Sequence, residues 1–257
     1  MEVAPDILAL LAAVAFLAGA IDAMAGGGGL LTIPALLAAG IPPVSALATN
    51  KLQSAFGTAS AFAAYARAGH VDLRRFAMPV AGAFAGSAGG AAVVQHVDPS
   101  FLAALVPVLL VLMGFYFLLA PPMSHVDRHA RLGPRGLTIV VTLIGFYDGF
   151  FGPGTGSFLT TALVAFGGLG LVRAIANTKL LNLATNIAAL LAMVAGGQLL
   201  WTLGIAMAIA NVGGNQLGAY LAIRFNGRGV RPLLVVLSLA LTLKLLADPA
   251  NPLWRMF

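Results

Sequence analysis

Two lysines in apolar surroundings are the residues of this sequence best suited to bind a charged ligand. Lys51 and Lys179 each lie early in a long apolar run, within the similar segments Ala46–Leu52 and Ala174–Leu180. A lysine near the bilayer centre costs on the order of 3 kcal/mol, so it usually faces a cavity or a partner. The alternative is that each side chain extends to the lipid headgroups. Two lysines at matching positions favour a shared anion site.

Each half of the chain also has a glycine-rich interruption of an apolar run, at Asp22–Leu30 and at Asp148–Gly156. Glycine disfavours helix by about 1 kcal/mol, and lipid cannot satisfy the exposed backbone groups. Each break must therefore face protein, a ligand or a watery cavity. A helix starting at Leu30 or Ser157 would offer free N–H groups and a positive dipole end to an anion. The predicted donors are the N–H groups near Gly28, Gly29, Gly154 and Gly156.

Polar residues beside the lysines and the breaks complete the candidate site. Asp22 and Asp148 are the only acids deep in apolar runs. Pairing with the lysines, uptake of a coupling proton and capping of the following helix are all open roles for them. The side chains expected to contact the anion are those of Asn50, Gln53, Thr178 and Asn182. Further donors nearby are Thr49, Ser54, Asn177 and Asn186.

Other polar or small residues have structural alternatives. Gly82, Gly86, Gly90, Gly214 and Gly218 are expected to allow close helix packing. Asn211 and Asn215 are four residues apart and share a helix face, where they either line a pore or bond neighbouring helices. Arg173 is either a gate or an anchor at a helix end. The four histidines fall in or beside loops, so no metal site is expected.

The composition is that of an integral membrane protein. Of the 257 residues, 60% are hydrophobic and only 9% are charged, against roughly 25% charged in soluble domains. Because cysteine is absent, disulfides and thiolate metal sites are excluded. The net charge of +6 comes largely from three short loops, at 67–75, 128–135 and 224–231, which is the positive-inside pattern and not a nucleic-acid surface. The N-terminus lacks the basic region of a cleavable signal peptide, so the first apolar run is expected to remain as a span.

Hydropathy predicts an all-α polytopic protein with about eight full spans and two short segments, up to ten in all. A full span needs about 20 residues, and the runs at 30–39 and 157–168 are too short. These two runs are predicted to be half-helices or re-entrant segments. The apolar runs are 7–24, 30–39, 44–66, 76–95, 100–120, 136–151, 157–168, 171–195, 201–223 and 232–247.

The two halves form an internal repeat. Asp148 follows Asp22 by 126 residues, and Lys179 follows Lys51 by 128. We predict a first repeat over 1–120 with its broken helix at 22–30, a basic cytoplasmic linker over 121–135, and a second repeat over 136–257 with its broken helix at 148–157. Basic loops fall at non-corresponding positions of the halves, so the repeats are predicted to be inverted, with both termini outside.

The motifs around these residues resemble a known family. Gly19–Pro34, Ala48–Ser54 and Arg67–Val71 in the first half, with Gly152–Gly156 and Asn177–Lys179 in the second, look like the TauE/SafE sulfite-exporter (TSUP) family of anion permeases. The resemblance covers nearly the whole chain. It implies a bacterial, archaeal or plant membrane protein that moves sulfite, sulfoacetate or related sulfur oxyanions.

Together, these features predict a secondary transporter that exports a small oxyanion across the cytoplasmic (inner) membrane. The most favoured substrate is sulfite or an organosulfonate such as sulfoacetate. An anion channel, an importer of another small anion and, less favoured, an intramembrane enzyme are the alternatives. The expected partners are the anionic substrate, membrane lipid and a coupling proton or sodium ion, without a cofactor or nucleic acid. A homo-oligomer is compatible with the sequence.

Overall fold

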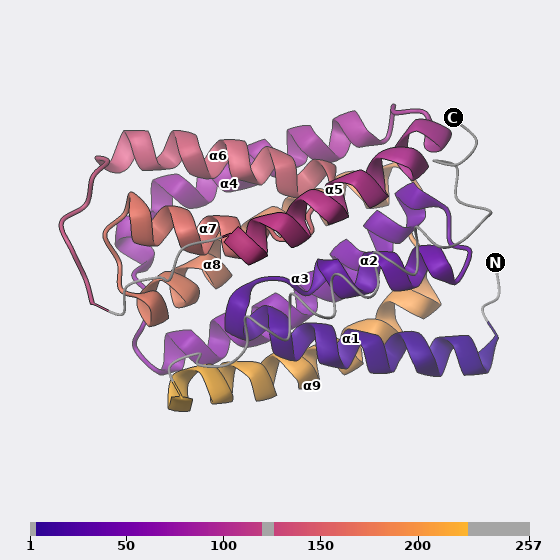
Figure 1. The fold of residues 1–257 in the computed structure, drawn as a ribbon, viewed down its shortest axis with the longest axis horizontal. Helices are drawn as coiled ribbons and strands as arrows, with labels where there is room; N and C mark the ends of the chain where they lie inside the picture. Colours follow the sequence, from indigo (N-terminus) through magenta and orange to yellow (C-terminus); the bar gives the residue numbers. More distant parts are fainter. Residues whose placement is uncertain (1–3, 120–125, 226–257) are drawn as a thin grey trace.

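The computed structural model describes residues 4–119 and 126–225, which form nine α-helices and no strand (Figure 1). The helices are α1 (Pro5–Ala25), α2 (Gly29–Ala38), α3 (Pro43–Arg67), α4 (Leu73–Val94), α5 (Pro99–Leu119), α6 (Pro134–Phe150), α7 (Thr155–Ala165), α8 (Leu171–Ala195) and α9 (Trp201–Phe225). The all-α prediction is confirmed, and nine of the predicted apolar runs match helices. The run at 232–247 and part of the predicted linker lie outside the described residues.

The helix breaks occur at the two predicted glycine-rich segments. Gly26 has a φ of 79°, a left-handed conformation that suits glycine, and it ends α1 by donating its N–H to the Asp22 carbonyl. Gly154 has a φ of 83° directly before α7. The half-helices begin earlier than the predicted starts at Leu30 and Ser157, because the backbone of Gly29 and Thr155 is already helical.

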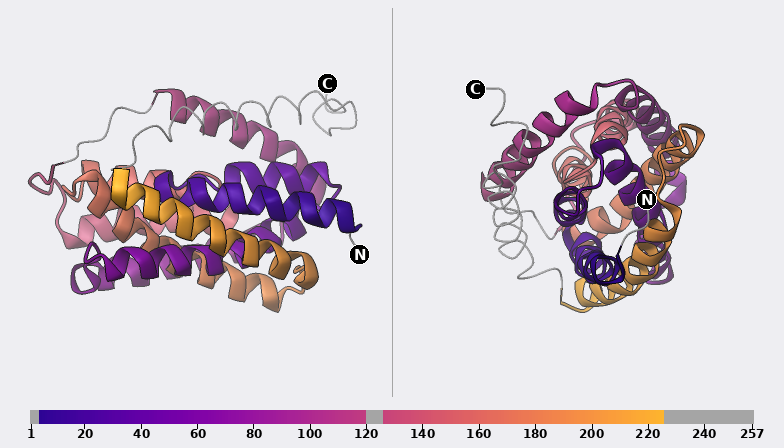
Figure 2. Two further views of the ribbon diagram at one scale, coloured as in Figure 1. Left: turned by 90° about the horizontal axis from the view of Figure 1, so that it is seen from below. Right: turned by 90° about the vertical axis from the view of Figure 1, so that its right-hand side faces the viewer.

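The fourth helix of each half packs on the other half. By the repeat spacing, α1 to α4 correspond to α6 to α9. In the structure α4 packs mainly against α6 and α8, and α9 packs mainly against α1 and α3. Helix α5 lies along the outside of the bundle (Figure 2). This exchange joins the halves into one bundle around the two breaks.

Glycines make these crossings possible, as predicted from their spacing. A Cβ atom on Gly86 of α4 would lie 2.2 Å from the Thr142 carbonyl oxygen of α6. The corresponding Cβ on Gly214 of α9 would lie 1.9 Å from the Phe16 carbonyl oxygen of α1. Any side chain at either position would push the helices apart.

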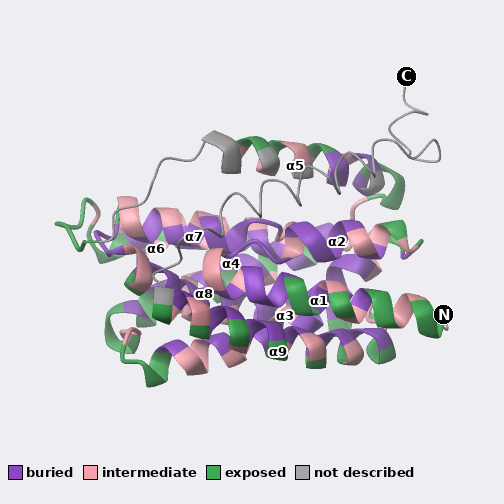
Figure 3. Ribbon diagram, turned by 60° about the horizontal axis from the view of Figure 1, so that its bottom comes forward, coloured by how far each residue is buried: buried purple, intermediate pink, exposed green. Residues whose placement is uncertain are grey.

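The outer faces of the helices are apolar. Exposed positions lie on the outward sides of the helices in Figure 3. The exposed large hydrophobic residues include Leu17, Phe84 and Ile209. Among the described residues, α1, α4 and α8 are long and apolar enough to cross a membrane. Helices α3 and α9 are as long as α8, at 25 residues each. Their mean hydropathy is lower because of the polar residues on their inner faces. The count of about eight full spans stays a prediction.

Candidate functional site

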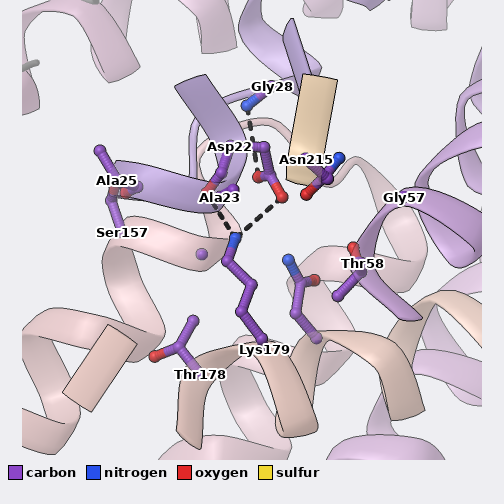
Figure 4. A network of polar contacts seen from close by, with 12 residues as sticks. Asp22, Ala23, Ala25, Gly28, Gly57, Thr58, Ser157, Thr178, Lys179 and Asn215 are labelled. Atoms are coloured by element: carbon purple, nitrogen blue, oxygen red, sulfur yellow. Dashed lines mark hydrogen bonds and ion pairs between the residues drawn. The ribbon is translucent and has the colours of Figure 1, made fainter. Parts of the chain in front are cut away.

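The two helix breaks contact each other inside the bundle. A Cβ atom on Gly26 would lie 2.3 Å from the carbonyl carbon of Gly156. Ser157, in the first turn of α7, donates its N–H to the Gly26 carbonyl (3.1 Å) and its hydroxyl to the Ala25 carbonyl (2.5 Å) (Figure 4). The absence of side chains at Gly26 and Gly156 therefore lets two segments 130 residues apart in the sequence meet backbone to backbone.

Each buried lysine pairs with the aspartate of the opposite half. Lys51 Nζ lies 2.9 Å from Asp148 Oδ2. Lys179 Nζ lies 2.8 Å from Asp22 Oδ2 (Figure 4). The lysines are 1% and 0% exposed, so the alternative that they extend to the headgroups is wrong. Of the open roles for the aspartates, pairing is confirmed. Asp22 also caps α2, because its Oδ1 accepts the N–H of Gly28 at 3.4 Å. Proton coupling stays a prediction.

A small polar cavity lies at this crossing. It has about 20 Å³ of free space, which is room for about one water molecule. Eight of the predicted site residues line it: Asp22, Gly29, Asn50, Lys51, Asp148, Gly154, Gly156 and Asn182. The structure thus brings residues from both halves of the chain to one small polar cavity.

Four predicted residues lie beside the cavity without lining it, namely Gly28, Gln53, Thr178 and Lys179. Gln53 Nε2 donates to Asn50 Oδ1 (3.0 Å), which also accepts the Thr32 hydroxyl of α2 (2.6 Å). In the second half, Thr160 of α7 donates to the Thr178 hydroxyl (3.1 Å). Gln53 and Thr178 thus belong to hydrogen-bonded contacts that fix the half-helices to α3 and α8.

Five lining residues were absent from the predicted contact set. They are Gly26, Ser54, Thr58, Gly152 and Asn186, of which only Ser54 and Asn186 were expected as further donors. Helical spacing from the lysines identifies three of them, because residues three and seven positions later share a helix face. That rule gives Ser54 and Thr58 after Lys51, and Asn186 after Lys179.

The paired asparagines of α9 bond helices together and do not line this cavity. Asn211 Nδ2 donates to the Ala15 carbonyl of α1 (2.8 Å), and Asn215 Nδ2 donates to Asn211 Oδ1 (2.9 Å). A Cβ on Gly57 of α3 would lie 1.8 Å from Asn211 Oδ1. Of the two predicted roles, interhelical bonding is the one confirmed.

Several basic loops gather at the end of the bundle opposite the N-terminus (Figure 1). Arg75 donates to the Gly167 carbonyl (2.7 Å), and Arg173 forms an exposed ion pair with Asp127 of the linker. The N–H of Gly170 lowers the pKa of the Asp127 carboxyl below its usual value, and Arg173 adds to this effect. Arg173 is therefore an anchor between α8 and the linker.

Comparison with known proteins gives a consistent assignment. The family model described as "Sulfite exporter TauE/SafE" matches residues 11–245. The chain is 45% identical over 253 residues to "Probable membrane transporter protein ORF9" of a Sinorhizobium species, covering 98% of this chain and 97% of that protein. It is 43% identical over 247 residues to "Probable membrane transporter protein YfcA" of Escherichia coli K12, covering 96% and 92%.

A third relative, a "Probable membrane transporter protein" of Haemophilus influenzae, is 40% identical over 249 residues, covering 96% of this chain and 98% of that protein. No solved structure matches. The motifs, the extent of the family match and the full-length relatives agree, and the chain therefore belongs to the sulfite exporter TauE/SafE family of membrane transporters.

Proposed function

We propose that this transporter exports a small oxyanion, sulfite or an organosulfonate such as sulfoacetate, across the cytoplasmic membrane without converting it chemically. The observation that carries this proposal is the small polar cavity at the crossing of two broken helices, with Lys51 in its wall. An ammonium group and backbone N–H groups at helix starts are donors suited to oxyanions. Lys179 adds a second buried positive charge beside the cavity.

The carboxylates make this site suitable for a coupled transporter. Two lysines and two aspartates balance one another in the absence of substrate, so an added anion brings at least one uncompensated negative charge. Uptake of a proton by Asp22 or Asp148, or a sodium ion, would restore neutrality. The membrane potential, at about 2.3 kcal/mol per charge per 100 mV, favours the exit of an anion from a negative interior.

We propose inverted repeats and an N-terminus outside the cell. Helices α1 and α6, which correspond in sequence, run in opposite directions along the bundle in Figure 1, which supports inversion. The basic residues Arg75, Arg128 and Arg173 lie at the end opposite the N-terminus, in agreement with the positive-inside rule. Alternating access would then result from rocking of one element past the other around the shared site.

A carrier is favoured over a channel because the free space of about 20 Å³ between the largely buried side chains holds about one water and forms no wide pore. Counterflow separates the two. With unlabelled sulfite inside proteoliposomes, a carrier should accelerate the entry of labelled sulfite. An unchanged entry rate would support a channel.

The experiment that tests the proposal is sulfite transport by the purified full chain in proteoliposomes. Lys51→Ala and Lys179→Ala should each reduce the rate strongly, while Arg173→Ala, which changes an exposed cation, serves as the control. Native rates in Lys51→Ala and Lys179→Ala variants that insert normally would refute it.

A further inference from the structure

The Lys179–Asp22 pair is held on several sides. Lys179 Nζ contacts Asp22 Oδ2 at 2.8 Å and the Asp22 backbone carbonyl at 2.5 Å. That carbonyl also accepts the N–H of Gly26, which ends α1, and the second carboxylate oxygen accepts the N–H of Gly28. Lys179 thus fixes the main chain on one side of the break, while Asp22 caps the helix on the other (Figure 4).

The Lys51–Asp148 pair has fewer contacts. Lys51 Nζ lies 2.9 Å from Asp148 Oδ2, but this approach falls outside hydrogen-bond geometry, and Oδ2 has no other hydrogen-bond partner in the described part of the chain. The second contact of Lys51 is a long one, 3.5 Å to Asn186 Oδ1. Among the described residues, no hydrogen bond joins the Lys51 ammonium group to the backbone of the α6–α7 break. This pair is therefore the one whose partners can be exchanged at lower cost.

The cavity lies on the side of the Lys51–Asp148 pair. Both residues of this pair line it, together with the polar side chains of Thr58 and Asn186. Of the other pair, Asp22 lines it and Lys179 does not, so Lys51 is the lysine of the two pairs that faces the free space. The free space of about 20 Å³ holds about one water, which is too small for a sulfite ion beside the carboxylate. An anion placed next to the buried Asp148 carboxylate would also meet like-charge repulsion in a medium of low dielectric constant.

We propose that the Asp148 carboxylate is an internal competitor of the substrate, and that an oxyanion of about the size of sulfite binds by displacing it from Lys51. Lys51 has one negative partner before the exchange and one after it. Displacement of the Asp148 carboxylate gives the anion both the space that the carboxylate filled and the positive charge of Lys51. The Lys179–Asp22 pair is a positioning pair that holds the α1–α2 break in shape during this step. This inference rests on the proposed function, since it assigns the step at which that transporter takes up its anion.

The matched aspartates provide the test. In the detergent-purified full chain, sulfite binding is measured as the rise in unfolding temperature with sulfite concentration. In Asp148→Asn the competitor is gone and Lys51 is unpaired, so sulfite should bind at least about tenfold more tightly than to the native chain. In Asp22→Asn the sulfite affinity should stay within about threefold of native, while the maximal transport rate in proteoliposomes falls.

Two further measurements keep the test valid if Asp148→Asn does not fold in the absence of sulfite. Purification in sulfite should recover that variant, because the anion replaces the missing charge. The double variant Lys51→Gln with Asp148→Asn leaves no buried unpaired charge, and sulfite should no longer raise its unfolding temperature. A retained sulfite effect in the double variant would overturn the proposal.

The outcomes separate the two proposals. Equal changes of sulfite affinity in Asp22→Asn and Asp148→Asn, or a larger gain in Asp22→Asn, would overturn the competitor role while leaving sulfite transport intact. If neither sulfite nor sulfoacetate stabilises the native chain, and neither is transported, the proposed function itself fails.

Discussion

The two halves of the molecule are alike in their packing and unlike at their ion pairs. Gly86 and Gly214 allow equivalent close helix crossings, and Thr32 and Thr160 attach the two half-helices in equivalent ways. At the site, however, Lys179 holds both the carboxylate and the backbone of Asp22, while Lys51 has one carboxylate contact and faces the cavity. Repetition thus builds a symmetric scaffold, and the local contacts at the breaks give the two lysines different environments.

The largest structural effect should come from filling the contact between the breaks. In Gly156→Ala the new Cβ would lie 2.5 Å from the Gly26 Cα atom, so the two breaks must separate. We expect destabilisation of about 3 kcal/mol and loss of transport, measured as the yield of folded chain, the unfolding temperature and sulfite flux.

The control for this change is Gly133→Ala, because no atom of the described residues lies within 4 Å of a Cβ at Gly133 and its φ of −68° suits alanine. A Gly156→Ala variant as stable and active as Gly133→Ala would show that the two breaks do not need to touch.

The symmetric part of the comparison predicts equal costs at the helix crossings. Gly86→Ala and Gly214→Ala each place a Cβ about 2 Å from a carbonyl oxygen of the neighbouring helix. Each should lose about 1–3 kcal/mol of stability, and the two losses should agree within about 1 kcal/mol. Unfolding temperatures that differ widely between them would mean that the halves are not equivalent in packing either.

A smaller effect should follow from loosening one half-helix. Thr160→Val removes the hydroxyl that α7 donates to Thr178, at a cost of about 1 kcal/mol. Thr32→Val in the first half removes the corresponding bond to Asn50, whose Oδ1 still accepts from Gln53, so its cost should not be larger. Thermal unfolding of the two variants measures this difference, and a clearly greater loss in Thr32→Val would contradict the role given to Gln53.

The smallest effect should be at the exposed linker. The pKa of Asp127 is lowered by the Gly170 N–H and by Arg173, so its contribution to stability is present at neutral pH and is lost as the pH falls below about 4. Asp127→Asn should remove this acid dependence with little change in transport at neutral pH. Hydrogen exchange of the loop at 166–170, followed from pH 7 to pH 3, measures this acid-dependent loss of stability. A loss of protection well above pH 4 would exclude Asp127 as the cause.

Much of this architecture could be predicted from the sequence, because membrane helices have strong local signals. Hydropathy located the described helices within a few residues, and the glycine runs located both breaks. The repeat spacing then related Lys51 to Lys179 and Asp22 to Asp148. The packing of α4 and α9 each against the opposite half could not be predicted, since hydropathy does not say which helices are neighbours.

The candidate site was predicted in its residue types and less well in its geometry. The roles of Asp22 and Asp148 remained open because their pairing joins residues about 100 or more positions apart in the chain. Thr58 was missed because its hydroxyl is inconspicuous in sequence, although it lies two helical turns after Lys51. Which lysine faces the cavity depends on backbone contacts at the breaks, such as that of Lys179 with the Asp22 carbonyl, and no pattern of residue types reports these.

The most direct measurement of the central claim is counterflow of labelled sulfite into proteoliposomes containing the Lys51→Gln, Asp148→Asn double variant. This variant keeps the cavity shape, removes the exchangeable charge pair and leaves no buried charge unbalanced. We predict that it folds with a native unfolding temperature to within a few degrees and that its sulfite flux falls by about a hundredfold or more. A correctly inserted double variant that carries sulfite at the native rate would contradict the claim that this buried lysine binds the transported anion.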